Sequence, residues 1–101
     1  MKVLDIKVAD FSEIPFGRSR EDGDYSAEAF REDVLIPALN SSDLVNIDLD
    51  GVWGYGSSFL SEVFNVKKLP TDDKGEIICK INIITTKDHY RIEVMEYLKG
   101  N

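Results

Sequence analysis

Residues 47–64 read IDLDGVWGYGSSFLSEVF, the segment of this chain with the clearest succession of local patterns. Its opening residues alternate between apolar and polar and predict a strand, and the glycine-rich stretch that follows predicts a turn with two exposed aromatic residues. Paired serines then precede apolar residues at helical spacing. The first N–H groups of a helix have no intrahelical partner. The segment therefore predicts strand, turn and helix, with a helix start suited to an anion or to a phosphorylated serine.

The same two periodicities recur on both sides of this segment. Alternation predicts three strands, which contain Leu4, Ile6 and Val8; Val45, Ile47 and Leu49; and Ile77, Cys79, Ile81 and Ile83. Helical spacing predicts a helix after Ser26 with Phe30, Val34, Leu35 and Ala38, a second with Phe59, Leu60, Val63 and Phe64, and a third over residues 87–99 that Gly100 ends. Residues 11–25 and 70–75 predict loops. Pro37 predicts a kink or a new short turn, because its ring clashes with the carbonyl of Asp33 in a regular helix.

The alternation of strands and helices predicts one α/β domain over residues 1–101. We expect a small mixed or mostly parallel sheet with right-handed crossovers. A sheet covered on both faces has continuously apolar strands, whereas two of these strands carry charged or amide residues at alternate positions. Helices are therefore expected mainly on one face.

Composition excludes several classes of function. The net charge of −7 is opposite to that of nucleic-acid-binding proteins and disfavours an anionic membrane surface. No apolar run reaches the length of about 20 residues that a membrane span needs. Cys79 is the only cysteine, so no internal disulfide can form. These features predict a cytoplasmic protein.

The turn after the second strand holds the first group of candidate residues. Ligands of open α/β sheets bind beyond the carboxyl ends of the strands, which is where this turn lies. Gly51, Gly54 and Gly56 allow a partner to approach closely, or they serve turn geometry alone. Trp53 and Tyr55 are partner-contact residues, or they fold back on the edge of the core.

Three interpretations apply to Ser57 and Ser58. They are helix caps, phosphoacceptors or hydrolase nucleophiles. The nucleophile interpretation fails, because neither serine lies in a Gly-x-Ser-x-Gly motif and His89 is the only base of the usual kind. We therefore predict no catalytic residue and no enzyme activity.

No cofactor is predicted either. Asp48 and Asp50 lie two residues apart on a strand with no nearby histidine, so no metal site is expected.

Arg18 and Arg20 complete the candidate site. If the first two strands are parallel, the loop that carries these two arginines lies at the same edge of the sheet as Ser57. An arginine at that edge can bind a phosphate with two hydrogen bonds. The alternative is local pairing with Glu21, Asp22 and Asp24.

The central segment resembles STAS domains, the fold of the anti-sigma-factor antagonists. In these proteins an Asp-Ser-Ser-Gly motif follows a Leu-Asp-Leu-Ser strand, and a kinase phosphorylates the first serine. Residues 47–52 resemble that strand and residues 56–59 resemble the motif, so that Ser57 corresponds to the phosphoacceptor. Gly56 stands where the family has Asp, and Phe59 where it has Gly.

A broader resemblance is to a bacterial STAS-like family of largely unknown function. It rests on residues 17–18, 22–23, 28–32, 35–39 and 54–60, which read GR, DG, EAFRE, LIPAL and GYGSSFL. Members of that family are often encoded beside ATP-binding proteins of the histidine-kinase type, which implies such a protein as partner. The resemblance implies a non-enzymatic signalling module that switches partners under phosphorylation at Ser57 or Ser58. A sensor of a small anionic ligand and an accessory subunit of an ATPase or other enzyme complex are the alternatives.

Overall fold

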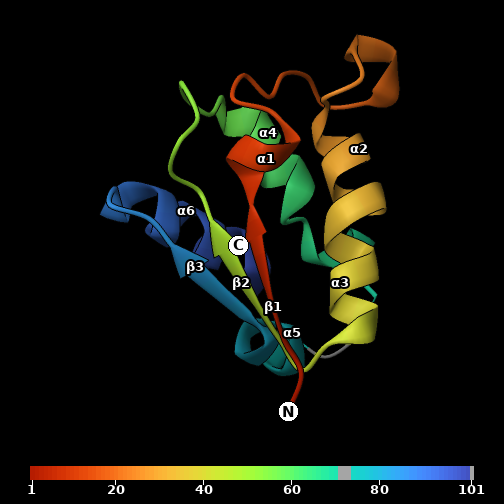
Figure 1. The fold of residues 1–101 in the computed structure, drawn as a ribbon, viewed down its shortest axis with the longest axis vertical. Helices are drawn as coiled ribbons and strands as arrows, with labels where there is room; N and C mark the ends of the chain where they lie inside the picture. Colours follow the sequence, from red (N-terminus) through yellow and green to blue (C-terminus); the bar gives the residue numbers. More distant parts are fainter. Residues whose placement is uncertain (71–73, 101) are drawn as a thin grey trace.

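Three parallel strands form one sheet in the computed structural model, which describes residues 1–70 and 74–100 apart from the side chains of Ser57 and Lys74. The strands are β1 (Val3–Lys7), β2 (Leu44–Asp48) and β3 (Ile81–Ile84), in the order β1-β2-β3 (Figure 1). Parallel strands need long crossovers, and helices fill both of them. The sheet is thus the mostly parallel one that the sequence predicts.

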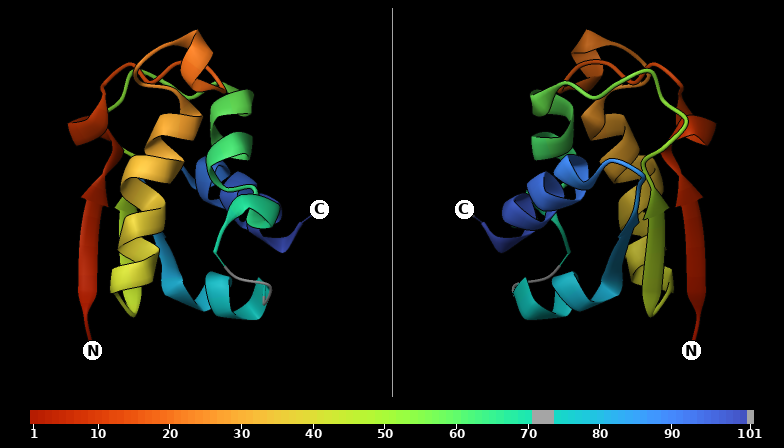
Figure 2. Two further views of the ribbon diagram at one scale, coloured as in Figure 1. Left: turned by 90° about the vertical axis from the view of Figure 1, so that its right-hand side faces the viewer. Right: turned by 90° about the vertical axis from the view of Figure 1, so that its left-hand side faces the viewer.

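The helices follow the strands in the predicted alternation. After β1 come α1 (Val8–Phe11), the short η1 (Arg20–Asp22), α2 (Ala27–Phe30), η2 (Arg31–Leu35) and α3 (Ile36–Ser41). After β2 come α4 (Ser57–Val63), η3 (Val66–Lys68) and α5 (Lys74–Lys80), and α6 (Asp88–Lys99) follows β3. The strand order never reverses, so right-handed crossovers place their helices on one side of the sheet. Figure 2 shows this arrangement and confirms the prediction of helices mainly on one face.

The two faces of the sheet differ in chemistry. Val45, Ile47, Ile81 and Ile83 point into the helical layer and are buried, as part of the core. On the opposite face, Asp5, Asn46 and Asn82 lie in register on the three strands. The Asn82 amide donates to Asn46 Oδ1 (3.0 Å), and the Asn46 amide donates to Asp5 Oδ1 (2.9 Å). This row of hydrogen bonds gives the open face a polar centre that water can cover, with the exposed side chains of Val3 and Ile84 on the same face.

Pro37 is accommodated by a widening of the helix just before it, rather than by the kink or new short turn that the sequence predicts. Residues Arg31–Leu35 form a π-helical turn, in which the N–H of Ile36 donates to the carbonyl of Arg31 five residues earlier. A wider turn relieves the clash between a proline ring and the preceding turn, and no donor is lost because proline has none. The chain continues as α3 with Pro37 in its first turn.

The prediction for the third strand was wrong at its start. Ile77 and Cys79 belong to α5, and the strand begins only at Ile81. Ile77 and Ile81 are both buried, and their spacing of four fits a helix as well as the alternation of a strand. Lys74 and Gly75, predicted as loop, also lie in α5, while residues 71–73 of that loop lie outside the described residues.

The predicted loop over residues 11–25 was wrong in part, because it contains the last residue of α1 and the short helix η1. Other boundaries shift by one residue or are confirmed. Val8 is the first residue of α1 rather than the end of β1, and Leu49 follows β2 directly. Gly100 ends α6 with a left-handed backbone (φ 79°), as predicted. Among the described residues, no helix has the length and apolar character that crossing a membrane requires.

Candidate functional site

Two aspartates fix the turn between β2 and α4 at the carboxyl end of the sheet. The Asp50 carboxylate accepts hydrogen bonds from the hydroxyl of Thr85 (3.0 Å) and the backbone N–H of Thr86 (3.0 Å), which precede α6. Asp48 Oδ1 accepts from the N–H of Asp50 (2.9 Å). The Asp50 carboxylate therefore holds the turn against the neighbouring loop, while the Asp48 carboxylate fixes the turn from within. The described residues contain no group of three or more His, Cys, Asp or Glu side chains that could hold a metal ion.

The three candidate glycines have different structural roles. Gly51 has a positive φ of 89°, and a Cβ there would lie 3.1 Å from the Cβ of Ala9. This position therefore requires glycine for the turn itself. Gly54 has open space around it, and a Cβ on Gly56 would meet only Ser58 Oγ at 3.9 Å. The local packing therefore leaves Gly54 and Gly56 open to approach by a partner.

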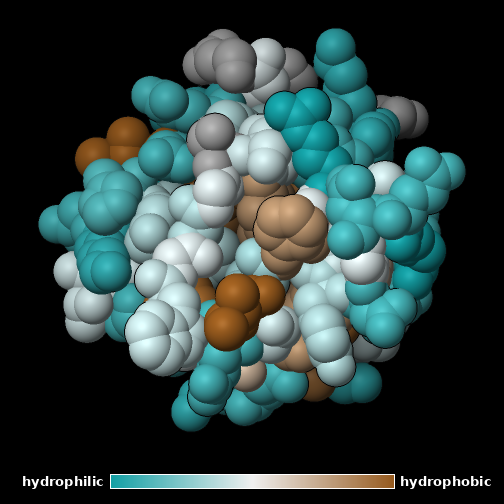
Figure 3. Space-filling model, turned by 90° about the horizontal axis from the view of Figure 1, so that it is seen from above, coloured by the Kyte–Doolittle hydropathy of each residue, from teal (hydrophilic) through white to brown (hydrophobic). Residues whose placement is uncertain are grey.

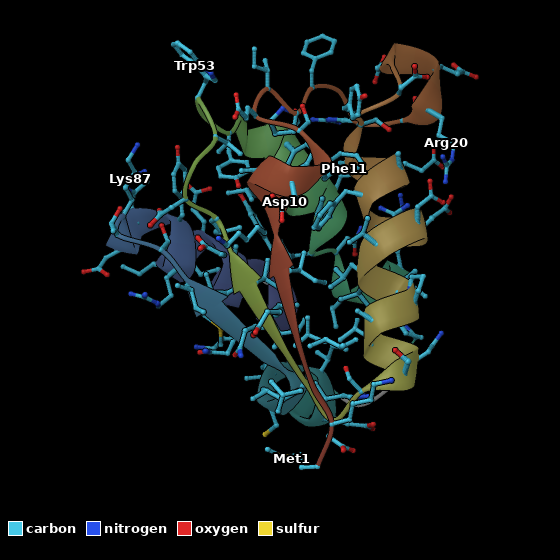
Figure 4. The ribbon with its side chains drawn as sticks, in the orientation of Figure 1. Met1, Asp10, Phe11, Arg20, Trp53 and Lys87 are labelled. Carbon is cyan, nitrogen blue, oxygen red and sulfur yellow. The ribbon has the colours of Figure 1, made fainter. Side chains whose placement is uncertain are left out.

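The two aromatic residues of the turn point in opposite directions. Trp53 is 82% exposed and extends away from the sheet (Figure 4). Tyr55 is half-buried, and its ring packs against those of Phe59 and Tyr90. Its hydroxyl donates to the carbonyl of Leu49 (2.8 Å). Burial, together with nearby negative groups, raises its pKa above the usual tyrosine range. The prediction of two exposed aromatics was right for Trp53 and wrong for Tyr55.

The serine pair opens α4, as predicted, but neither serine is the capping residue. Gly56 occupies the N-cap position with an extended backbone, and Ser57 and Ser58 are the first two helical residues. Glycine has no side chain, so the N-cap residue itself provides no side-chain cap. The interpretation of the serines as caps is therefore wrong. Ser58 is half-buried, and the side chain of Ser57 is outside the described part of the structure.

A buried arginine fixes the other end of α4. Arg31, in the π-helical turn, donates from its guanidinium to the carbonyl of Glu62 (2.7 Å) and to the Glu62 carboxylate (3.2 Å). Lys68 also pairs with Glu62, and the hydrogen bonds from these two cations lower the pKa of that carboxyl. The widened turn before Pro37 thus helps to place the helix that begins with the serines.

Arg18 and Arg20 separate in the structure. Arg18 lines an open pocket of about 350 Å³ at the carboxyl end of the sheet, together with Phe16, Gly56 and Ser58. Arg20 instead forms two hydrogen bonds with Asp33 (2.8 and 3.2 Å) and a contact with Glu32 (3.4 Å). Its hydrogen bond to Asp33 lowers the pKa of that carboxyl. The Arg20 side chain therefore faces η2 rather than the serines, and its partners are not Glu21, Asp22 or Asp24, which the alternative of local pairing named.

Asp22 holds the loop that carries Arg18. Its carboxylate accepts from the backbone N–H groups of Arg18 (2.9 Å) and Ser19 (3.1 Å), and these bonds lower its pKa. The backbone of Gly17 packs against the Asp22 side chain with a φ of 91°. A Cβ on Gly17 would lie only 2.4 Å from the Cβ of Asp22. The loop is therefore built around Asp22, which also lines the pocket.

The sequence analysis did not predict a group of exposed apolar side chains at this end of the molecule. Ile14 and Phe16 are each 68% exposed and Tyr25 is 54% exposed, beside the exposed Trp53. We call these four residues the carboxyl-end patch. Figure 3 shows apolar groups gathered at the centre of this surface, with polar residues around them. The only signal in the sequence is the presence of apolar residues in a charged loop where they fit no periodicity.

Comparisons with known proteins give one match. No curated protein and no solved structure is similar enough to match the chain. A family model described as a STAS-like domain of unknown function matches residues 26–91, about two thirds of the chain, from the residue before α2 into α6. The match includes the turn with Trp53 and the start of α4. With its parallel sheet, its helices on one face and the serine pair after β2, this chain belongs to the STAS-like family of unknown function.

Proposed function

We propose that this domain is a non-enzymatic regulatory module that binds a protein partner at the carboxyl end of its sheet. A phosphoryl group on Ser57 or Ser58, transferred by an ATP-binding kinase-like partner, controls that binding. The observation that carries the proposal is an exposed Trp53 four residues before the serine pair that opens α4. An exposed tryptophan is the side chain most often found as an anchor in protein interfaces.

The surroundings of the serines suit a phosphoryl group. The N–H of Phe59 donates to the carbonyl of Gly56, whereas the N–H groups of the two serines before it have no intrahelical acceptor. The partial positive charge of a helix start also stabilises an anion. Arg18 lines the same pocket as Ser58, and a guanidinium is well matched to phosphate oxygens. A phosphoryl group would thus be accommodated without loss of the fold. It would also add about 1.5–2 negative charges where a partner has to dock.

Those charges give the switch its direction. A partner whose interface meets an added, unpaired charge loses several kcal/mol of binding free energy. Phosphorylation is therefore expected to weaken or redirect the binding of the kinase-like partner. Ser57→Ala should bind it constitutively, and Ser57→Asp should bind weakly with an unchanged melting temperature.

The decisive experiment incubates the chain with ATP and a kinase-like ATP-binding protein from the same genome. Mass spectrometry under denaturing conditions should then find one added phosphoryl group, because a covalent phosphate survives denaturation. The phosphoryl group should disappear when Ser57 and Ser58 are both replaced by Ala. Ser61→Ala, one turn further along α4, is the matched control and should be phosphorylated normally. A phosphoryl group that persists in the double variant would contradict the proposal.

A sensor of a small anion is the second candidate, and the pocket beside Arg18 favours it. The same instrument separates the two functions, since a bound metabolite appears in native spectra and is lost on denaturation. Arg18→Ala should then abolish the bound mass. Arg20→Ala is the matched control, because its guanidinium is already paired with Asp33.

A further inference from the structure

Exposed apolar side chains are concentrated at one end of this molecule. Among the described residues, eight large hydrophobic side chains are exposed, and four of them form the carboxyl-end patch. The other four lie outside the loops that carry the patch. They are the first residue, Met1; Val3 and Ile84 on the open sheet face; and Ile92 on α6. Single exposed hydrophobic residues need no explanation, whereas a group of them marks an interaction surface.

Two loops carry the patch, and a backbone hydrogen bond joins them, from the N–H of Trp53 to the carbonyl of Glu13 (2.9 Å). A second bond, from the N–H of Phe16 to the carbonyl of Tyr25 (3.1 Å), closes the first loop on itself. The loop is also fastened to α2, because the N–H groups of Ala27 and Glu28 donate to residues 17 and 18. The patch is therefore held in place before any partner arrives, which lowers the entropic cost of binding.

Aromatic packing supports the patch from below. The ring of Tyr25 lies 5.5 Å from that of Phe11 in an edge-to-face arrangement, and Phe11 lies 5.2 Å from the buried Phe30. One side of Tyr25 is thus anchored in the core, while about half of its surface remains in solvent. A fixed aromatic side chain with one free face is well suited to contact a partner.

The charges on the two loops that carry the patch restrict what the partner can be. Residues 10–25 and 48–58 carry seven acidic side chains and only two basic ones, Arg18 and Arg20. Arg20 is neutralised by Asp33 and Glu32. None of the salt bridges among the described residues involves Asp10, Glu13, Glu21 or Asp24. A second copy of this chain would bring an equal set of negative charges to the interface, which like-charge repulsion disfavours.

We infer that the carboxyl-end patch docks a basic amphipathic helix of a partner protein, whose apolar face covers Phe16 and Trp53 and whose flanking Lys or Arg side chains meet the acidic rim. This inference rests on the proposed function, because it names the partner chemistry for the same binding surface. An apolar face flanked by cations matches an apolar centre with an acidic rim, and such charge pairs steer association. A phosphoryl group at Ser57 would strengthen the attraction for this partner, so phosphorylation would redirect the domain from the kinase-like protein towards it.

The test uses two synthetic helical peptides that share one apolar face and contain no tryptophan. One carries Lys and Arg beside that face, and the other carries Glu at the same positions. Trp53 is the only tryptophan of the chain, so its fluorescence reports directly on the patch. The basic peptide should shift the Trp53 emission, with an affinity that falls as salt is added, and the acidic peptide should not.

Variants and mapping make the test specific. Phe16→Ser should weaken binding of the basic peptide about tenfold, as expected for an anchor residue. Ile92→Ser is the matched control, since Ile92 is 59% exposed on α6, outside the two loops, and this variant should bind like the wild type. Backbone amide shifts should change in residues 12–25 and 51–56. Circular dichroism of each variant checks that the fold is retained.

Three results would overturn the inference: equal binding of both peptides, binding of neither, or amide shifts confined to the open sheet face. The experiment contains no kinase and no phosphate. It can therefore fail while phosphorylation of the serines succeeds, and it can succeed while phosphorylation fails.

Discussion

The open face of the sheet and the carboxyl-end patch are both exposed, yet they differ in what they leave unsatisfied. On the open face, Asp5, Asn46 and Asn82 bond to one another across the three strands. At the carboxyl end, Trp53 and Phe16 present apolar surface that gains from leaving water. A polar row can remain solvated at no cost, whereas a fixed apolar patch is stabilised by a partner. The polar row thus explains why the first region needs no covering layer, and the second region is the binding surface that we propose.

Among these substitutions, Trp53→Ala in the carboxyl-end patch is expected to have the largest effect, a loss of partner affinity. Because Trp53 is 82% exposed, its removal should leave the melting temperature almost unchanged. Binding of the proposed kinase-like partner should weaken by about 2 kcal/mol or more, as for an interface anchor. Isothermal titration calorimetry measures this loss. Ile92→Ala is the control of similar chemistry, and equal affinities for the two variants would show that the patch is not the interface.

Tyr55→Phe separates support of the turn from contact with the partner. The substitution leaves the carbonyl of Leu49 without its hydrogen bond, so the free energy of unfolding should fall by about 1–2 kcal/mol in urea denaturation. Partner affinity should change little, because Tyr55 faces the core. A loss of affinity as large as that of Trp53→Ala would mean that the hydroxyl itself touches the partner.

Tyr55 also gives the chain a dependence on alkaline pH. Its pKa is raised in the folded state, so the folded chain holds the phenolic proton more tightly than the unfolded chain does. The associated stability is complete below the unfolded tyrosine pKa of about 10 and is lost as the pH rises above it. Urea denaturation at increasing pH should show a smaller loss in the Tyr55→Phe variant than in the wild type.

Asn46→Ala should produce the smallest effect, and it tests the open face. The substitution removes both hydrogen bonds of the polar row, but water can replace them on Asp5 and Asn82. The expected loss of stability is about 1 kcal/mol or less, with no change in partner affinity. Loss of partner binding in a folded Asn46→Ala variant would place the interface on the sheet and would remove the distinction between the two regions.

Local patterns in the sequence determined most of the fold. The alternation in residues 4–8 and 45–49 predicted two strands to within a residue or two, and apolar residues at helical spacing predicted α4 and α6. Polar residues at alternate strand positions predicted the open face. The error at Ile77 and Cys79 arose because a short apolar run satisfies both periodicities, and pairing with β2 decides where the strand starts.

Only the tertiary structure decided which candidate residues face solvent and which are held by partners within the protein. Trp53 and Tyr55 are two residues apart, but only Tyr55 has Tyr90 and the Leu49 carbonyl as partners. Arg18 and Arg20 are likewise neighbours, and only Arg20 reaches Asp33. A single sequence encodes periodicity, because the geometry of helices and strands repeats over a few residues. The direction of a loop side chain depends on partners distant in the chain, and only the folded protein brings these together.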